Sequence, residues 1–394
     1  MSKRESNLIA IACGGTGGHL FPGIAVGHEL ERQGCEVLLL ISPKEVDQEA
    51  VRHLDSMKVA TLPAVGLQNR NYISFAWGFI KAFRNSVRML RERRPAAVLA
   101  MGGFTAAPPV LAGRRIGAKT FLHESNAIPG RANRMLARFV NRAFVGFRES
   151  GDRLKIRSVD VTGTPVRDRF VSTDAAACRR SLELQPERPT LLIMGGSQGA
   201  VGVNRIAMDF LPDLRERHTD LQILWLAGAH DETRVRTFCA EGNYSAVVHK
   251  FLPEMELAYG ASTVAIARSG ASTLSEFAAM QLPSILIPLP SAADNHQYHN
   301  ALNFKKTGAA RLLPQKGSEP EQFCESLSEL ISSRDARDKM RQALSQWHRK
   351  DAAAQIASSI LHELGHSSAT EQTAHGGEPK NLNEVEDSLR LALP

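Results

Sequence analysis

The feature that most constrains the fold is a repeated pattern, in which an apolar run stops at a cluster of glycines. Residues 8–13 read Leu-Ile-Ala-Ile-Ala-Cys, and four of the next five residues are glycine. Residues 190–194 and the glycines that follow repeat the pattern half a chain later. Each copy predicts a buried parallel strand, then a turn that aims backbone N–H groups and a helix N-terminus at a phosphate. Two copies predict two similar domains with a two-phosphate ligand between them.

The spacing within the first copy disfavours two common nucleotide fingerprints. A dinucleotide motif needs glycine three residues after Gly17, where Leu20 stands. A P-loop needs Lys and then Ser or Thr after the last glycine, where His19 and Leu20 stand. The chain also lacks a strict Asp-x-Asp motif for a metal-bound nucleotide sugar. We therefore expect no NAD, ATP, metal or other cofactor.

Length and composition are those of a multi-domain globular protein. A chain of 394 residues is too long for one ordinary core, so two or three domains are expected. The five cysteines have no paired spacing, which disfavours disulfides or a zinc site and suits a reducing cytosol. The polar start leads directly to residue 8, and no apolar run reaches the ~18 residues of a membrane span. We expect neither a signal peptide nor a transmembrane helix.

Short apolar runs alternate with helix-length segments along most of the chain. Helices are predicted over 20–34 and, closing the fold, over 321–333 and 336–364. The predicted strands lie at 8–13, 36–41, 97–101, 119–122, 143–145, 159–162, 190–194, 222–226, 246–248, 263–266 and 284–288. This alternation predicts an α/β fold of two Rossmann-like domains that face a central cleft. The expected boundaries are 1–166, 167–340, a closing helix over 341–366 and a disordered tail over 367–394.

The positive charge is concentrated in the first part of the chain. Residues 1–170 hold 26 Lys and Arg against 14 Asp and Glu, a net charge of +12. The remainder holds 22 against 27, a net charge of −5. A basic half indicates an anionic partner, which composition leaves open among nucleic acid, anionic lipid and a phosphorylated substrate.

Two polar motifs follow predicted strands in the second half. In residues 267–276, Ser272 or Thr273 is expected to cap a helix whose first turn leads to Glu276. That carboxylate can accept hydrogen bonds from ribose hydroxyls, or it can serve only as the glutamate of a capping box. In the cluster over 294–300, His296 and His299 lack enough further ligands at suitable spacing, so no metal site is predicted.

A basic amphipathic helix is predicted within residues 72–94, where Glu92 is the single acid. Trp77 lies at its start, and Phe79, Ile80, Phe83, Val87 and Leu90 follow helical spacing among Lys81, Arg84 and Arg88. A helix of this composition can lie on an anionic bilayer. The alternative is that its apolar stripe covers the sheet.

Seven motifs in order resemble the MurG family, N-acetylglucosaminyltransferases of the GT-B superfamily. They are GGTGGHLFPG at 14–23, MGGF at 101–104, HESNAIPG at 123–130, GTPVR at 163–167, GGSQGA at 195–200, RSGASTLSE at 268–276 and DNHQY at 294–298. The resemblance covers residues 8–360. The chain departs from the family pattern at Ser125, Thr164 and Leu252, where Gln, Asn and Ile are frequent.

The resemblance implies an inverting hexosyltransferase of peptidoglycan synthesis, and so a role in cell shape and division. UDP-GlcNAc would be the donor and undecaprenyl-diphospho-MurNAc-pentapeptide the acceptor. The protein would lie peripherally on the cytoplasmic face of the bacterial inner membrane, without a nucleic-acid partner. The donor contacts implied by position are Thr16, Gly17, Gly18, Asn126, Arg167, Ser197, Leu252, Ala271, Ser272, Thr273, Leu274, Ser275, Glu276 and Gln297.

The chemistry of such a transfer assigns tasks to residues already singled out. The leaving pyrophosphate needs stabilisation, which we expect from backbone amides of residues 195–199. The incoming hydroxyl needs a base, and His19 at the tip of the first glycine loop is the candidate. Alternatively, His19 is a structural residue that holds the loop. The competing functions are a UDP-sugar epimerase of the same architecture, a basic nucleic-acid-binding protein and, disfavoured by its spacing, an NAD-dependent oxidoreductase.

Overall fold

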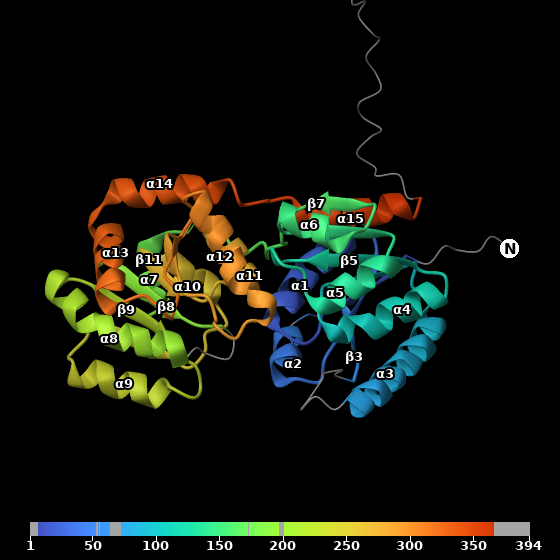
Figure 1. Cartoon of the computed structure of the whole chain (residues 1–394), viewed down its shortest axis with the longest axis horizontal. Coiled ribbons are helices and arrows are strands. Elements are labelled where there is room, and N and C mark those ends of the chain that lie inside the picture. Colours follow the sequence, from blue (N-terminus) through green and yellow to red (C-terminus); the bar gives the residue numbers. More distant parts are fainter. Residues whose placement is uncertain are drawn as a thin grey trace, which may run out of the picture.

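The computed structural model describes residues 7–52, 54, 56–63, 72–171, 173–196 and 201–365. Two α/β lobes lie side by side, and each is built around one parallel sheet (Figure 1). The predicted pair of Rossmann-like domains is confirmed.

The first lobe contains a sheet with the strand order β3-β2-β1-β4-β5-β6-β7. Its strands are β1 (Leu8–Ala12), β2 (Glu36–Ile41), β3 (Lys58–Thr61), β4 (Ala97–Ala100), β5 (Lys119–Glu124), β6 (Arg142–Val145) and β7 (Val159–Val161). Its helices are α1 (Gly17–Arg32), α2 (Glu45–Val51), α3 (Tyr72–Arg93), η1 (Phe104–Ala106), α4 (Ala107–Arg115), α5 (Arg131–Leu136), η2 (Ala137–Phe139) and α6 (Arg148–Leu154). The first strand thus lies near the middle, as in doubly wound nucleotide-binding folds.

The second lobe repeats this order in its own strands, as β10-β9-β8-β11-β12-β13. The strands are β8 (Thr190–Met194), β9 (Gln222–Leu226), β10 (Ala246–His249), β11 (Val264–Ala267), β12 (Ser284–Leu286) and β13 (Arg311–Leu312). The helices are α7 (Ala175–Ser181), α8 (Val201–Arg217), α9 (Glu232–Glu241), α10 (Met255–Ala261), α11 (Ala271–Met280), η3 (Ala293–Asn295), α12 (His296–Lys306), α13 (Pro320–Ser332) and α14 (Arg334–Ser345). The last helix, α15 (Ala352–Glu363), packs on the first lobe. The sequence repeat therefore corresponds to a repeated topology.

The two faces of the first sheet have separate apolar cores. In β1, Ala10 belongs to the cluster on the side of α3 and α4, whereas Ile9 and Ile11 belong to the cluster on the side of α1. Both faces are covered, so every residue of β1 is buried and the strand is apolar throughout. Two edge strands escaped prediction, since β3 is mostly exposed and β13 has only two residues.

The chain passes between the lobes twice, and the two connections lie against each other. A side chain at Gly163, in the first connection, would meet Arg349 of the second at 2.8 Å. The single helix expected over 336–364 is wrong, because α14 ends at Ser345 and the chain begins a separate helix, α15, at Ala352 on the first lobe (Figure 1). At this break Trp347 stacks on Phe304 and donates a hydrogen bond to Thr307.

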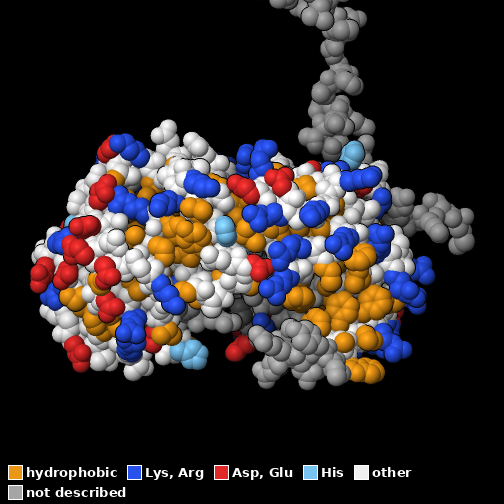
Figure 2. Space-filling model, viewed as in Figure 1, with side chains coloured by type: hydrophobic (Ala, Val, Ile, Leu, Met, Phe, Trp, Pro, Cys, Tyr) orange, Lys and Arg blue, Asp and Glu red, His pale blue; other side chains and the backbone are white. Residues whose placement is uncertain are grey.

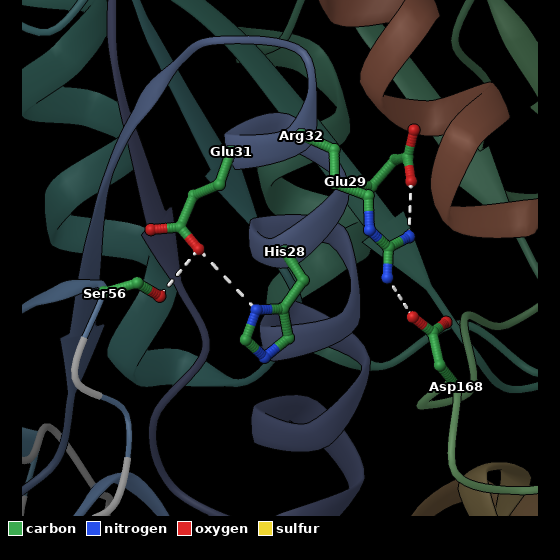
Figure 3. A network of polar contacts seen from close by, with 6 residues as sticks. All are labelled: His28, Glu29, Glu31, Arg32, Ser56 and Asp168. Atoms are coloured by element: carbon green, nitrogen blue, oxygen red, sulfur yellow. Dashed lines mark hydrogen bonds and ion pairs between the residues drawn. The ribbon is translucent and has the colours of Figure 1, made fainter.

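A surface ion pair also joins the first lobe to the first connection. Figure 3 shows Arg32 of α1 between Glu29, one turn earlier, and Asp168, which follows β7. Arg32 and Asp168 are largely exposed, so their pair contributes little, on the order of 0–1 kcal/mol. Buried contacts between the lobes therefore matter more.

Candidate active site

The carboxyl ends of the central strands bring the predicted motifs to the place where the lobes meet. Arg134 lies in α5, after the loop that follows β5, and its guanidinium is 2.7 Å from the Asp294 carboxylate of the second lobe. The backbone N–H of Ala127 donates to Asn300 of α12 at 2.9 Å. Ligands of open α/β sheets bind at such strand ends. This interface is therefore the candidate site.

The first glycine loop is held by side chains from neighbouring elements. The Gly15 N–H donates to buried Asp47 at 2.7 Å, and its carbonyl accepts from Lys44 at 2.8 Å. Thr105 donates to the Gly14 carbonyl at 2.7 Å. Gly15 has a φ of 120°, which a residue with a side chain rarely adopts. These contacts hold Gly14 and Gly15 in place. The N-terminus of α1 follows directly, and its backbone N–H groups are the ones that can meet an anion.

His19 lies in the first turn of α1, which begins at Gly17, and the prediction that it lies at a loop tip is wrong. Its Nδ1 lies 3.2 Å from Thr16 Oγ1. Its ring rests on Gly102, where a Cβ would come within 2.8 Å of Nε2. Burial lowers the pKa of His19 to about 4, although the charge of Asp47 opposes the shift. The imidazole is therefore neutral near pH 7 and able to accept a proton.

Glu124, at the end of β5, organises the loop that carries Asn126. One carboxylate oxygen accepts from the N–H and side-chain amide of Asn126, at 2.8 and 3.0 Å. The other accepts from Gly130 and Asn133, at 2.9 and 2.7 Å. Burial raises the pKa of Glu124 against these hydrogen bonds. Sequence patterns did not single out Glu124, although an acid within a polar run directly after a buried strand was a usable signal.

His123, beside Glu124, connects β5 to the first connection between the lobes. Its Nε2 lies 3.1 Å from the Gly163 carbonyl, so this nitrogen carries the proton and donates. The Ser125 hydroxyl then donates to Nδ1 at 3.3 Å. Burial lowers the pKa of His123 to about 4.

Glu276 lies in the second turn of α11, with its carboxylate turned toward the interior. The helix is capped at Gly270 without a side-chain hydrogen bond, so the capping-box interpretation is wrong. The Tyr259 hydroxyl donates to Glu276 Oε2 at 2.9 Å. Arg167 Nη2 lies 3.7 Å from Oε1. Burial raises the pKa of Glu276, and Arg167 opposes the shift.

Arg167 connects the two halves of the candidate site. Its guanidinium lies 3.9 Å from the ring centroid of Phe21, in the first turns of α1. The same group approaches Glu276 of α11, and burial lowers the pKa of Arg167. A cation over an aromatic face is attractive by about 0.5–2 kcal/mol. Arg167 thus brings the His19 helix and the Glu276 helix together.

Other predicted donor contacts lie at the same edge of the second sheet. Ala271, Ser272, Thr273, Leu274 and Ser275 form the first turns of α11, and buried Leu252 follows β10. The Gln297 side chain accepts from Leu289 N–H at 2.9 Å. Thr16, Gly17 and Gly18 lie at the start of α1. Ser197 and the amides of 197–199 lie outside the described residues.

Within the described ranges, no three His, Cys, Asp or Glu side chains are grouped as metal ligands. His296 begins α12 and its Nδ1 lies 2.8 Å from the Ala293 carbonyl. Among the helices in these ranges, none combines the length and apolarity of a bilayer span.

The predicted amphipathic helix is α3. The residues that suggested membrane binding lie on two different faces of this helix. Trp77 is 70% exposed and Ile80 is 47% exposed, and Lys81, Arg84 and Arg88 are exposed with them. Phe79 and Phe83 instead pack against the core on the α4 side. Phe79 and Phe83, which were among the residues predicted for a membrane face, are therefore partly buried and follow the alternative, in which the apolar stripe covers the lobe.

Sequence patterns missed further exposed apolar residues of the first lobe. Phe104, Met135 and Phe139 are exposed. Arg134 directly precedes Met135 in the chain, and Arg138 directly precedes Phe139. In Figure 2, hydrophobic side chains gather on the lower part of the first lobe with Lys and Arg beside them. Phe104 lies beside α3, since its ring centroid is 5.8 Å from that of Phe75.

Comparison with known proteins decides the family. Residues 9–145 match the glycosyltransferase family 28 N-terminal domain, and residues 190–356 match the family 28 C-terminal domain. The chain belongs to glycosyltransferase family 28. Family 28 membership makes it a hexosyltransferase, as its sequence resemblance implied.

The family 28 relatives include curated enzymes that match most of the chain. The UDP-N-acetylglucosamine–N-acetylmuramyl-(pentapeptide) pyrophosphoryl-undecaprenol N-acetylglucosamine transferase of Syntrophus aciditrophicus is 35% identical, over 78% of this chain and 85% of the relative. The enzyme of the same name from Acidithiobacillus ferrooxidans is 34% identical, over 91% and 98%. The MurG family resemblance is thereby confirmed.

Solved structures agree with the fold. Acinetobacter baumannii MurG is similar with a TM-score of 0.69 and 25% identity, over 90% of this chain and 99% of that one. A UDP-GlcNAc 2-epimerase from Neisseria meningitidis is similar with a TM-score of 0.66 and 16% identity, over 90% and 100%. The second likeness shows the fold alone.

Proposed function

We propose that this protein transfers GlcNAc from UDP-GlcNAc to undecaprenyl-diphospho-MurNAc-pentapeptide, with inversion at the sugar. The names of its curated relatives support these substrates. The observation that carries the proposal is Arg167, which contacts Phe21 of the His19 helix and approaches Glu276 of the other lobe. A transfer between two substrates needs such a meeting of one binding group from each lobe.

In this proposal the second lobe, residues 167–340, holds the donor. Glu276 accepts hydrogen bonds from the ribose hydroxyls, and the backbone of Leu252 contacts the uracil. The remaining contacts are Ser197, Gln297 and the first turns of α11. Thr16, Gly17, Gly18 and Asn126 reach the donor from the first lobe, residues 1–166, which also holds the acceptor. Arg167 supplies positive charge between them.

His19 is the proposed general base. The acceptor hydroxyl attacks the anomeric carbon on the face opposite the diphosphate, and His19 takes its proton. The bond between the anomeric carbon and the diphosphate oxygen breaks, UDP leaves with the electron pair, and the configuration inverts. The neutral state of His19 supports this role, because a protonated imidazole cannot accept the proton.

The leaving diphosphate is stabilised in this mechanism by helix N-termini and backbone N–H groups. The start of α1 and the amides of residues 195–199 are the proposed donors. Such groups favour negative charge and need no reorganisation during the reaction. No metal or other cofactor takes part in the proposal.

The first lobe is proposed to lie on the cytoplasmic face of the bacterial inner membrane. Exposed Trp77 and Ile80 of α3 can enter the headgroup region, and Lys81, Arg84 and Arg88 of the same helix can meet anionic lipid beside them. Aromatic and aliphatic side chains next to cations are typical of interfacial binding. This orientation allows the acceptor to keep its lipid tail in the bilayer.

The proposal is tested by incubating the protein with labelled UDP-GlcNAc and a lipid-linked MurNAc acceptor. Labelled disaccharide-lipid and UDP should form in equal amounts, and the new linkage should be inverted. Formation of an epimeric UDP-sugar in the absence of acceptor would instead identify the epimerase alternative. Salt-sensitive binding to RNA or DNA, without transfer, would favour the nucleic-acid-binding alternative.

A further inference from the structure

A fully buried amide joins the two lobes at the candidate site. Asn300 lies on α12 of the second lobe and is 0% exposed. Its Oδ1 accepts from the Ala127 N–H of the first lobe at 2.9 Å. Its Nδ2 donates to the Ser269 carbonyl at 3.2 Å and to Asn126 Oδ1 at 3.1 Å. One side chain thus satisfies three groups from two segments.

The direction of these hydrogen bonds follows from their backbone partners. A backbone N–H can only donate and a carbonyl can only accept, so Ala127 and Ser269 determine which end of the Asn300 amide is nitrogen. Asn300 must then donate to the oxygen of Asn126. The nitrogen of Asn126 consequently points to Glu124, to which it donates at 3.0 Å. The Asn126 amide is therefore oriented from both lobes.

We propose that Asn300 is a positioning residue, which orients Asn126 for the donor when the two lobes are together. The inference rests on the proposed function, which gives Asn126 a donor contact. Asn126 is half-buried, so it can meet a ligand, whereas Asn300 is enclosed. Without the Asn300 amide, buried polar groups of both lobes lose a partner, which is costly. Asn300 acts on the donor through Asn126.

Alanine and aspartate at position 300 test the proposal by steady-state kinetics. Asn300→Ala should raise the KM for UDP-GlcNAc about tenfold or more, with a smaller change in the KM of the acceptor. Asn300→Asp should have the larger effect, because it places a second acceptor against the Ser269 carbonyl and Asn126 Oδ1. The matched control is Asn303→Ala, one turn along α12, where the side chain donates only to the His299 carbonyl of its own helix.

A double-mutant cycle with Asn126→Ala separates this inference from the proposed function. If Asn126→Ala leaves the donor KM unchanged, the donor contact in the proposed function is wrong. If Asn126→Ala raises it, Asn300→Ala should add little in that background. An equal effect of Asn300→Ala with and without Asn126 would overturn the positioning role.

Circular dichroism and thermal unfolding establish that each variant is folded. If Asn300→Ala does not fold, Asn300→Ser takes its place in the cycle, because a serine leaves room for a water and keeps one polar group. A donor KM equal to that of the parent in a folded Asn300→Ser or Asn300→Ala variant contradicts the proposal. A raised donor KM that depends on Asn126 supports it.

Discussion

The hydroxyl of Tyr259 donates to the Glu276 carboxylate at 2.9 Å, and both side chains are buried. Arg167 approaches the other carboxylate oxygen at 3.7 Å. The carboxylate is thus oriented before any donor is bound, which lowers the entropy lost on binding.

Replacement of Glu276 by alanine should raise the KM for UDP-GlcNAc much more than that for the acceptor. The loss of a charge-assisted hydrogen bond costs about 1.5–3 kcal/mol, or roughly 10- to 150-fold in affinity. Steady-state kinetics with each substrate varied in turn measure the two effects. Equal donor affinity in variant and parent would show that Glu276 has only a structural role.

Replacement of Tyr259 by phenylalanine should give a smaller rise in the same KM, about fivefold. The ring remains to pack on Phe170 and Phe277, but the hydroxyl no longer orients the carboxylate. Tyr244→Phe is the matched control, because Tyr244 stacks on Phe238 away from Glu276. A similar change in both variants would rule out a specific effect of the Tyr259 hydroxyl.

Replacement of His19 by alanine should lower kcat by about 10²- to 10⁴-fold if the imidazole is the base. Because burial lowers the pKa of His19 to about 4, the base form is present at all pH values above this. The acid limb of kcat/KM that belongs to His19 in the free enzyme should therefore lie near pH 4. A limb near pH 6.5 that disappears on substitution of His19 would show that burial does not lower the pKa of this imidazole.

The contribution of the buried histidines to the free energy of unfolding should decline as the pH falls from about 6.5 toward 4. The pKa of His123 is about 4 in the folded state, below the ordinary value of 6.5, so the unfolded chain binds the extra proton. The contribution is complete above pH 6.5, and its slope is at most about 1.4 kcal/mol per pH unit for each histidine. The raised pKa values of Glu124 and Glu276 act in the opposite direction.

Comparison of the parent with His123→Gln isolates this contribution. Glutamine can still donate near the Nε2 position toward the Gly163 carbonyl, but it does not titrate. Urea unfolding at several pH values from 7 to 4.5 should give a shallower decline for the variant. Parallel curves would mean that His123 does not change its protonation on unfolding.

Reversal of three exposed charges on α3 tests the membrane surface. Replacing Lys81, Arg84 and Arg88 with glutamate should abolish sedimentation with anionic vesicles, because each basic residue contributes about 1 kcal/mol near such a surface. Turnover of a short-chain, water-soluble acceptor should persist. The control reverses Arg234, Lys306 and Lys316, which are exposed on the second lobe. Vesicle binding as tight as that of the parent would show that this face of α3 is not the membrane-binding surface.

Local pattern was sufficient to predict the central strands and to single out residues such as His19, Arg167 and Glu276, which the structure places where the lobes meet. Runs such as residues 190–194 are buried on both faces, so their composition alone indicated a strand. β13 could not be found in this way, since two residues carry no period. The role of Asn300 depends on Ala127 and Asn126, 173 and 174 residues away, and no short spacing predicts such a contact.

The position of α15 has a consequence for the order in which the chain is synthesised. Ile356, Ala357 and Ile360 belong to the same core as Ile9 and Ile11 of the first strand. The first lobe therefore leaves the ribosome with one face of its sheet incomplete, and it waits for the entire second lobe to be made. Domains usually fold as units during synthesis, N-terminal first. Here the last helix to emerge completes the first domain begun, so a chain truncated before α15 loses part of the lobe that it began with.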